Sequence, residues 1–260
     1  MKELLLKLKE ARRVVAVTGA GISAESGIST FRGDGGLWRR YEATSLASPS
    51  AFRANPSLVW EFYHYRRAIV EQSAPNPGHF ALAQLERLFE HFLLITQNVD
   101  GLHELAGSRA LIEIHGSIRK VKCSKCDYKG AWEHPICAAL EQAEIRADFS
   151  ANPANLSNAE LPTCPLCGGL LRPDIVWFGE NLDQANLDRA CDAANAADVL
   201  LVIGTSSQVY PVAMIAPNAA ANGTYVAEIN LGATPHTGDF AVHIDGASGA
   251  VLPELIRQLQ

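Results

Sequence analysis

The stretch that decides the fold is Val14-Val-Ala-Val-Thr-Gly19-Ala-Gly-Ile-Ser-Ala24. It opens with a continuous apolar run, which is typical of a strand buried on both faces. The residues that follow fit G-x-G-x-x-A, a pattern whose glycines let backbone N–H groups approach a pyrophosphate. Glycine turns after strands are common, so the motif alone is weak. Together, strand and turn predict a dinucleotide-binding α/β unit.

Further apolar runs predict the rest of the sheet. They cover residues 92–95, 111–114, 175–177, 199–203, 225–229 and 241–244. Helical stretches fit between them at 78–90 and 185–197, and residues 1–10 form an amphipathic pattern. Strands alternating with helices predict a doubly wound, Rossmann-like parallel sheet covered on both faces.

Two segments interrupt this alternation and predict a smaller inserted domain. One is helical and aromatic, and the other contains two C-x-x-C pairs. We expect residues 1–37, 75–118 and 171–260 to form the sheet domain, and residues 38–74 and 119–170 to form the smaller helical and zinc-binding domain.

The paired cysteines predict a metal site. They are Cys123, Cys126, Cys164 and Cys167. Four thiolates are the ligand set of a closed tetrahedral zinc site, and a closed site leaves no position for water. The gap between the pairs exceeds the usual ~15–20 residues, and a loop rich in Asn, Ala and Pro at 151–162 accounts for the excess. We therefore expect one structural Zn²⁺ per chain, and we expect Cys137 and Cys191 to be small core residues.

Composition narrows the possible partners and location. The net charge is -6 and the pI is about 5.8, which argues against direct nucleic-acid binding. No apolar stretch of about 18 residues occurs, so we expect no membrane span. Residues 1–10 include acids and lack a signal-peptide core, so we expect a cytoplasmic protein.

Small or polar residues follow five of the predicted strands. After the first comes the glycine turn, and after the others come 96–100, His115, 204–207 and Asn230. Carboxyl ends of parallel strands meet at one edge, so these residues should converge on one ligand site. The acid that dehydrogenases carry about 20 residues after the motif is absent, and residues 38–41 read Trp-Arg-Arg-Tyr instead.

Taken together, these features resemble the sirtuin family of NAD-dependent protein deacylases. The matching segments are Gly19-Ala-Gly-Ile-Ser-Ala-Glu-Ser-Gly-Ile-Ser-Thr-Phe-Arg-Gly33, Thr96-Gln-Asn-Val-Asp-Gly-Leu-His103, Glu113-Ile-His-Gly-Ser117, Gly204-Thr-Ser206 and the cysteine pairs. They occur in the family's order, and the resemblance covers the chain from Arg13 onward.

The resemblance implies that NAD lies across the strand ends as co-substrate. Its pyrophosphate would rest on the glycine turn, and the nicotinamide ribose would lie under the loop that follows. The residues expected to contact NAD are Gly19, Ala20, Gly21, Ala24, Phe31, Arg32, Trp38, Gln97, Asn98, Val99, Asp100, Gly204, Thr205, Ser206, Asn230, Leu231 and Ser248. The alternative for Asn98 and Asp100 is that they cap the following helix.

The resemblance also implies a mechanism with His115 as general base. The acyl-lysine oxygen attacks the ribose carbon that bears nicotinamide, and His115 takes a proton from a ribose hydroxyl. Water completes the reaction, giving free lysine, nicotinamide and 2'-O-acyl-ADP-ribose. Imidazole suits the step because its ordinary pKa of ~6.5 lets it accept a proton near neutrality.

The helical segment 62–67, Phe-Tyr-His-Tyr-Arg-Arg, refines the expected substrate. Tyr63 and Arg66 lie three residues apart and share a helix face. Two adjacent arginines on a helix usually form a solvated face, but the resemblance is to the class that removes acidic acyl groups and carries Tyr-x-x-Arg. Arginine and tyrosine can bind a succinyl, malonyl or glutaryl carboxylate. A strand edge at 176–180 would hold the substrate peptide through Val176, Trp177, Phe178 and Gly179.

Two other functions remain open from the sequence. One is a mono-ADP-ribosyltransferase that uses the same NAD site, and the other is a non-catalytic NAD-sensing module. The presence of His115 argues against the second. The expected partners are acylated-lysine proteins or peptides and NAD, without nucleic acid or membrane.

Overall fold

The computed structural model describes residues 1–30, 43–132 and 161–260. Its larger sheet has six strands in the order β3-β2-β1-β7-β8-β9, and every neighbouring pair is parallel. The strands are β1 Arg13–Thr18, β2 His91–Thr96, β3 Leu111–Glu113, β7 Val199–Ile203, β8 Tyr225–Asn230 and β9 Val242–Asp245. The last residue of β1, Thr18, pairs with Thr96 of β2 and Ile203 of β7, so these three strands end level with one another.

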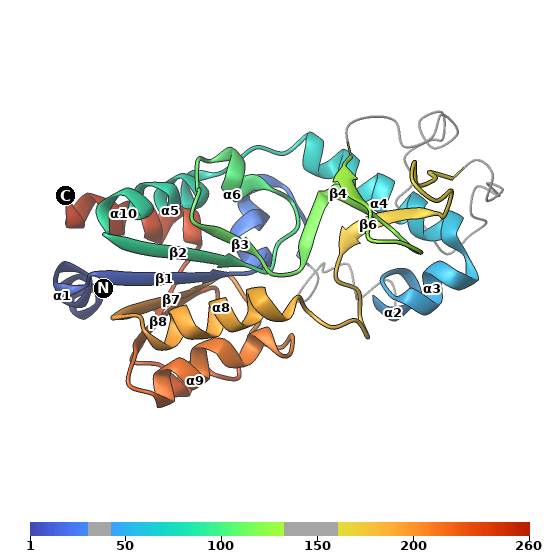
Figure 1. Cartoon of the computed structure of the whole chain (residues 1–260). Coiled ribbons are helices and arrows are strands. Elements are labelled where there is room, and N and C mark those ends of the chain that lie inside the picture. Colours follow the sequence, from blue (N-terminus) through green and yellow to red (C-terminus); the bar gives the residue numbers. More distant parts are fainter. Residues whose placement is uncertain (31–42, 133–160) are drawn as a thin grey trace.

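Helices cover both faces of this sheet (Figure 1). On one face lie α1 Lys2–Glu10, α5 Pro77–Leu88 and α10 Ser248–Leu259, and on the other lie α8 Gln184–Asn195 and α9 Ile215–Ala221. Each group buries its own apolar cluster against the strands. The doubly wound sheet is confirmed, and the three helices predicted at 1–10, 78–90 and 185–197 are α1, α5 and α8.

Short elements at the carboxyl edge of the sheet shape the loops there. The glycine turn continues into η1 Ala20–Ser26, and α6 Leu102–Leu105 follows β2. The Asn76 side chain caps α5 by accepting the Gly78 N–H at 2.9 Å, and it donates to the Ile22 carbonyl at 2.7 Å. This one side chain therefore fixes η1 against the start of α5. Two further 3₁₀ turns are η3 Val212–Met214 and η4 Thr237–Asp239.

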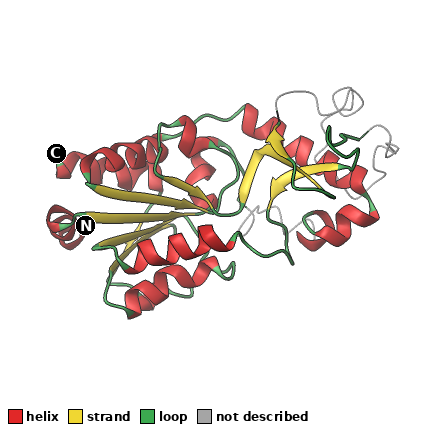
Figure 2. Ribbon diagram, in the orientation of Figure 1, coloured by secondary structure: helices red, strands yellow, loops and turns green. Residues whose placement is uncertain are grey.

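A second, smaller sheet lies beyond the carboxyl edge of the first (Figure 2). It is antiparallel, in the order β5-β4-β6, with β4 Gly116–Cys123, β5 Lys129–Ala131 and β6 Leu171–Ile175. The helices α2 Ala43–Leu46, α3 Pro49–Ala54 and α4 Pro56–Glu71 pack on it. Trp60, Phe62 and Tyr63 of α4 are buried in the shared core of these elements.

The apolar run at 175–177 does not belong to the parallel sheet, and this part of the prediction is wrong. Ile175 ends β6 and pairs with Gly116 of β4 in the antiparallel sheet. Ile175 and Trp177 are buried in the smaller core rather than against the larger sheet. The continuous apolar run correctly predicted that these residues are buried. It carries no information about which strand they lie beside.

We propose that the chain divides into a sheet domain and a smaller inserted domain. The smaller core draws its buried residues from 46–70, Val99, 118–132 and 161–177, so β6 packs in the smaller core although the expected boundary at residue 171 assigned it to the sheet domain. The two cores of the parallel sheet draw theirs from 4–22, 81–95, 112–114, 190–229 and 252–256. No described helix is long and apolar enough to cross a membrane.

Candidate active site

A cavity of about 830 Å³ opens at the carboxyl edge of the parallel sheet. Strand-end loops form one wall, and α4 with residues 175–180 contributes another. The predicted site residues that line it are Gly19, Ala20, Gly21, Ala24, Tyr63, Arg66, Gln97, Asn98, Val99, His115, Val176, Trp177, Phe178, Gly179, Gly204, Thr205, Ser206, Asn230, Leu231 and Ser248. Phe31, Arg32, Trp38 and Cys137 lie outside the described residues.

The glycine turn lies against the turn that follows β7. The Gly21 N–H donates to the Gly204 carbonyl at 2.7 Å. A Cβ at Gly21 would lie 2.7 Å from that oxygen, and a Cβ at Gly19 would lie 2.8 Å from the Thr205 Cβ. Both distances are shorter than real contacts, so only glycine fits. The result is a cavity wall made of bare backbone, the surface to which a pyrophosphate can come close.

Two carboxamides after β2 join the loops of neighbouring strands. Asn98 Nδ2 donates to the Gly19 carbonyl at 3.1 Å and to Ser23 Oγ at 3.0 Å. Gln97 Nε2 donates to Thr205 Oγ1 at 3.0 Å. Asn98 therefore holds the glycine turn in place, which a simple helix cap would not do.

Asp100 does not line the cavity formed by the described residues, unlike the other predicted NAD contacts within those residues. Its Oδ1 accepts the Leu102 N–H at 2.9 Å, and its Oδ2 accepts the Ser23 hydroxyl at 2.8 Å. The carboxylate is buried and both of its oxygens are bonded internally. Its place thus matches the capping alternative at the start of α6, with an added link to η1.

His115 lies two residues after the end of β3, and its ring is held by a hydrogen bond to a backbone carbonyl. Nδ1 lies 3.0 Å from the Gln97 carbonyl oxygen. A carbonyl only accepts, so Nδ1 carries the hydrogen and Nε2 is left as the proton acceptor. Burial lowers the pKa of His115 below its ordinary value, and the bond to Gln97 opposes that shift. The ring is therefore neutral at pH 7 and able to take up a proton inside the cavity.

A buried polar cluster beneath the cavity was missed by the sequence reasoning. Ser23 connects Asn98 to Asp100, and its Oγ lies 3.4 Å from His79 Nε2. His103 Nε2 lies 3.0 Å from Thr18 Oγ1, and the ring is buried. Of the two positions that the sequence leaves open for His103, the helix surface or a place behind the site, the structure has the second, because α6 turns the ring inward toward Thr18 of β1. A signal was available, since Ser23 and His103 both fall within the segments that follow strands.

At the other end of the cavity, Tyr63 and Arg66 lie together on α4. The Arg66 guanidinium carbon is 5.6 Å from the centroid of the Tyr63 ring. Burial raises the pKa of Tyr63, so its hydroxyl stays protonated and can donate. Burial lowers the pKa of Arg66, and the neighbouring Tyr63 and Asp100 oppose that shift. A hydroxyl donor beside a guanidinium can bind a carboxylate.

Residues 176–180 are not a strand edge, and this prediction is wrong. The segment turns at Phe178 and Gly179, and Gly179 has φ +87°. Its amides are already used, because Val176 N–H donates to the His115 carbonyl and Phe178 N–H donates to the Ala47 carbonyl, both at 2.9 Å. These bonds join the segment to His115 and to Ala47, the residue after α2, so the segment forms a fixed cavity wall.

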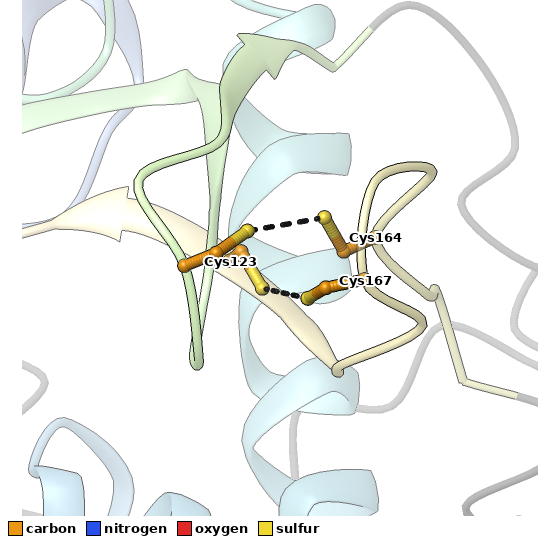
Figure 3. Close-up of side chains that lie close together, drawn as sticks. Cys123, Cys164 and Cys167 are labelled. Carbon is orange, nitrogen blue, oxygen red and sulfur yellow. Dashed lines mark hydrogen bonds between the residues drawn. The ribbon is translucent and has the colours of Figure 1, made fainter.

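The four paired cysteines come together away from the cavity (Figure 3). Their sulfur atoms all lie within 4.8 Å of one another, and the closest pairs, Cys123–Cys167 and Cys126–Cys164, are 3.5 and 3.6 Å apart. A disulfide needs about 2.05 Å, whereas tetrahedral Zn–S bonds of about 2.3 Å place sulfurs roughly 3.8 Å apart. Lys125 and Gly169 N–H groups donate to two of the sulfurs, which favours thiolates. The cluster fits a zinc site.

Known structures share this architecture. A Sir2 homologue in complex with NAD matches with a TM-score of 0.85 and 42% identity, covering 100% of this chain and 93% of that chain. A Sir2 complex with a p53 peptide and NAD⁺ matches with a TM-score of 0.84 and 32% identity, covering 99% of this chain and 98% of that chain.

Curated relatives match this chain over nearly its full length. The mitochondrial NAD-dependent protein deacylase sirtuin-5 of Canis lupus familiaris is 49% identical, over 95% of this chain and 82% of the relative. An NAD-dependent protein deacylase of Pyrococcus furiosus is 46% identical, over 97% of this chain and 95% of that relative.

The cytoplasmic location expected from residues 1–10 is contradicted, because the matched sirtuin-5 relatives are named mitochondrial. The charge pattern of ten residues was too little to support it.

The model of the Sir2 family matches residues 19–211. That span contains the glycine turn, His115, Tyr63 and Arg66 of α4, and the four clustered cysteines. With the doubly wound sheet, the inserted module and the relatives above, these features lead to one conclusion: the chain belongs to the Sir2 family.

Proposed function

We propose that the protein is an NAD-dependent protein-lysine deacylase, which transfers the acyl group of a modified lysine to ADP-ribose. The products are free lysine, nicotinamide and 2'-O-acyl-ADP-ribose. The observation that carries this proposal is the oriented, neutral His115 in the same cavity as the glycine turn. The names of the relatives and the NAD and peptide complexes of the structural neighbours support it.

NAD supplies the electrophilic ribose carbon and the ribose hydroxyl that receives the acyl group. Gly19 and Gly21 line the cavity where the pyrophosphate would lie, and Ser206, Asn230 and Leu231 line the part expected to hold adenosine. His115 Nε2 accepts the proton of a ribose hydroxyl, while the Gln97 carbonyl keeps Nδ1 protonated and the ring fixed.

We further propose that the enzyme removes succinyl, malonyl or glutaryl groups as well as acetyl. Tyr63 and Arg66 line the cavity on the side opposite the strand-end loops, where they would meet the distal carboxylate. A charge-assisted bond from a buried guanidinium is stronger than a neutral one, because few water molecules compete for it. The substrate peptide would run along Val176 and Gly179.

A mass-spectrometric assay tests both parts. One lysine peptide is prepared in acetyl, succinyl, malonyl and glutaryl forms, and each is incubated with and without NAD. We expect loss of the acyl mass only with NAD, together with one equivalent each of nicotinamide and acyl-ADP-ribose. Attachment of ADP-ribose to the peptide, with the acyl group retained, would instead indicate a mono-ADP-ribosyltransferase.

A further inference from the structure

The Tyr63 hydroxyl has a fixed partner that the acyl-binding proposal does not use. Trp177 Nε1 donates to this oxygen at 2.8 Å, and the two residues are 1% and 2% exposed. The rings lie 6.3 Å apart between centroids. The indole N–H is only a donor, so the Tyr63 oxygen must be the acceptor. The hydroxyl proton therefore cannot point at the indole nitrogen and is left to donate elsewhere.

Trp177 is itself held from two sides by charged groups. The Arg172 guanidinium carbon lies 3.3 Å from the indole centroid, and Glu180 Oε2 accepts the Trp177 backbone N–H at 2.9 Å. Arg172 and Glu180 pair with each other through both carboxylate oxygens, and Arg172 also donates to the Ile175 carbonyl at 2.7 Å. Arg172 thus fixes the indole plane of Trp177 by stacking on it, and Glu180 fixes the Trp177 backbone through its N–H.

The ion pair between Arg172 and Glu180 also determines the charge of the cavity near Tyr63 and Arg66. Glu180 lines the cavity, and an unpaired carboxylate there would repel an acidic acyl group. Burial acts to raise the pKa of Glu180, but the bonds from Arg172 and the Trp177 amide outweigh it and bring the pKa below its usual value. Glu180 is therefore kept ionised, and its charge is balanced by Arg172. Among the described residues that line the cavity, Arg66 carries the guanidinium group expected to meet an incoming carboxylate.

We propose that Trp177 is a positioning residue for acyl selectivity: its indole N–H orients the Tyr63 hydroxyl so that the hydroxyl proton points toward the acyl group, and the Arg172–Glu180 pair holds the indole in place. This inference rests on the proposed recognition of acidic acyl groups by Tyr63 and Arg66. Without the indole donor, the phenol O–H is free to rotate toward other acceptors, and part of the carboxylate contact is lost.

A double-mutant cycle tests the proposal with matched acetyl and succinyl peptides. The variants are Trp177→Phe, Tyr63→Phe and the pair combined, and Trp132→Phe serves as the control. Trp132 is a buried tryptophan of the same module that does not line the cavity. An uncharged hydrogen bond contributes about 0.5–1.5 kcal/mol, which corresponds to roughly 2- to 12-fold.

We expect Trp177→Phe to lower kcat/KM for the succinyl peptide by about 2- to 12-fold more than kcat/KM for the acetyl peptide, so the succinyl-to-acetyl ratio should fall by that factor. The KM for NAD should not change. In the Tyr63→Phe background the same substitution should have no further effect on selectivity, because the hydroxyl that it orients is gone. Trp132→Phe should leave the succinyl-to-acetyl ratio unchanged.

Benzothienylalanine installed at position 177 provides a variant of nearly identical shape without the N–H. It keeps the packing with Arg172, so it should fold and show the same loss of selectivity as Trp177→Phe. An unchanged succinyl-to-acetyl ratio in both variants, or an equal loss in the Tyr63→Phe background, would overturn the positioning role. Wild-type enzyme that does not turn over succinyl peptide would instead overturn the proposed acidic-acyl recognition, and this inference with it.

Discussion

Replacing His115 with alanine should abolish turnover while leaving NAD binding intact. Nε2 is the proton acceptor in the cavity because the Gln97 carbonyl holds the hydrogen on Nδ1. Loss of a general base commonly costs ~10²–10⁴-fold in rate, which is about 2.7–5.4 kcal/mol of transition-state stabilisation. Since the ring makes its one described hydrogen bond to backbone, the Kd for NAD measured by calorimetry should change less than about threefold.

The pH profile gives a second readout of the same residue. Burial lowers the pKa of His115 from 6.5, so more than roughly three quarters of the rings are neutral at pH 7. The acid limb of kcat/KM should therefore be centred below pH 6.5. His91→Ala is the matched control, because His91 is exposed at the opposite end of β2. Retention of more than about a tenth of the activity in His115→Ala, or a limb above pH 6.5, would refute the assignment.

Three further predictions concern the zinc site, the acyl-binding pair and acid stability. Cys167→Ser, or removal of the metal by a chelator, should lower the melting temperature and the activity together, because zinc binding contributes directly to folding; metal analysis and calorimetry check this. Arg66→Met should lower kcat/KM for a succinyl peptide by about ten- to a hundredfold and that for an acetyl peptide far less, and equal losses would contradict the carboxylate contact. Burial lowers the pKa of His79 from 6.5 to about 4, so the unfolded chain binds this proton more tightly. The free energy of unfolding should therefore fall as pH falls through that window, by on the order of 3 kcal/mol, and His79→Gln should remove this part of the pH dependence in urea titrations.

The parallel sheet and most of the cavity could be predicted from the sequence because topology places residues that follow parallel strands at one edge. His115, Asn98 and Asn230 are far apart in the chain, yet His115 and Asn98 lie two residues after the ends of β3 and β2, and Asn230 is the last residue of β8. The predicted convergence follows from that geometry alone. The zinc cluster was also predictable, since two C-x-x-C pairs supply a complete ligand set whatever the intervening loop does.

The wall at 176–180 could not be predicted, because its conformation depends on partners distant in sequence. Its turn is held by His115, by α2 and by the Arg172–Glu180 pair, and the Trp177–Tyr63 bond spans 114 positions. Apolar spacing carries no information about such contacts. The inward position of His103 could not be decided from the sequence for the same reason: the short helix α6 gives no reliable periodicity, and packing against β1 decides which way the ring faces.

The smaller module enters the chain at only two points, and both have the same place in the sheet topology. One insertion lies between β1 and α5 and the other between β3 and α8, so each follows the carboxyl end of a strand and precedes a helix that packs back on the sheet. Neither interrupts a strand or changes the pairing of β1 with β2 and β7. Because both insertions follow strand ends, a change in their length or sequence can alter α4 and the cysteine module while the strand order of the parallel sheet stays the same.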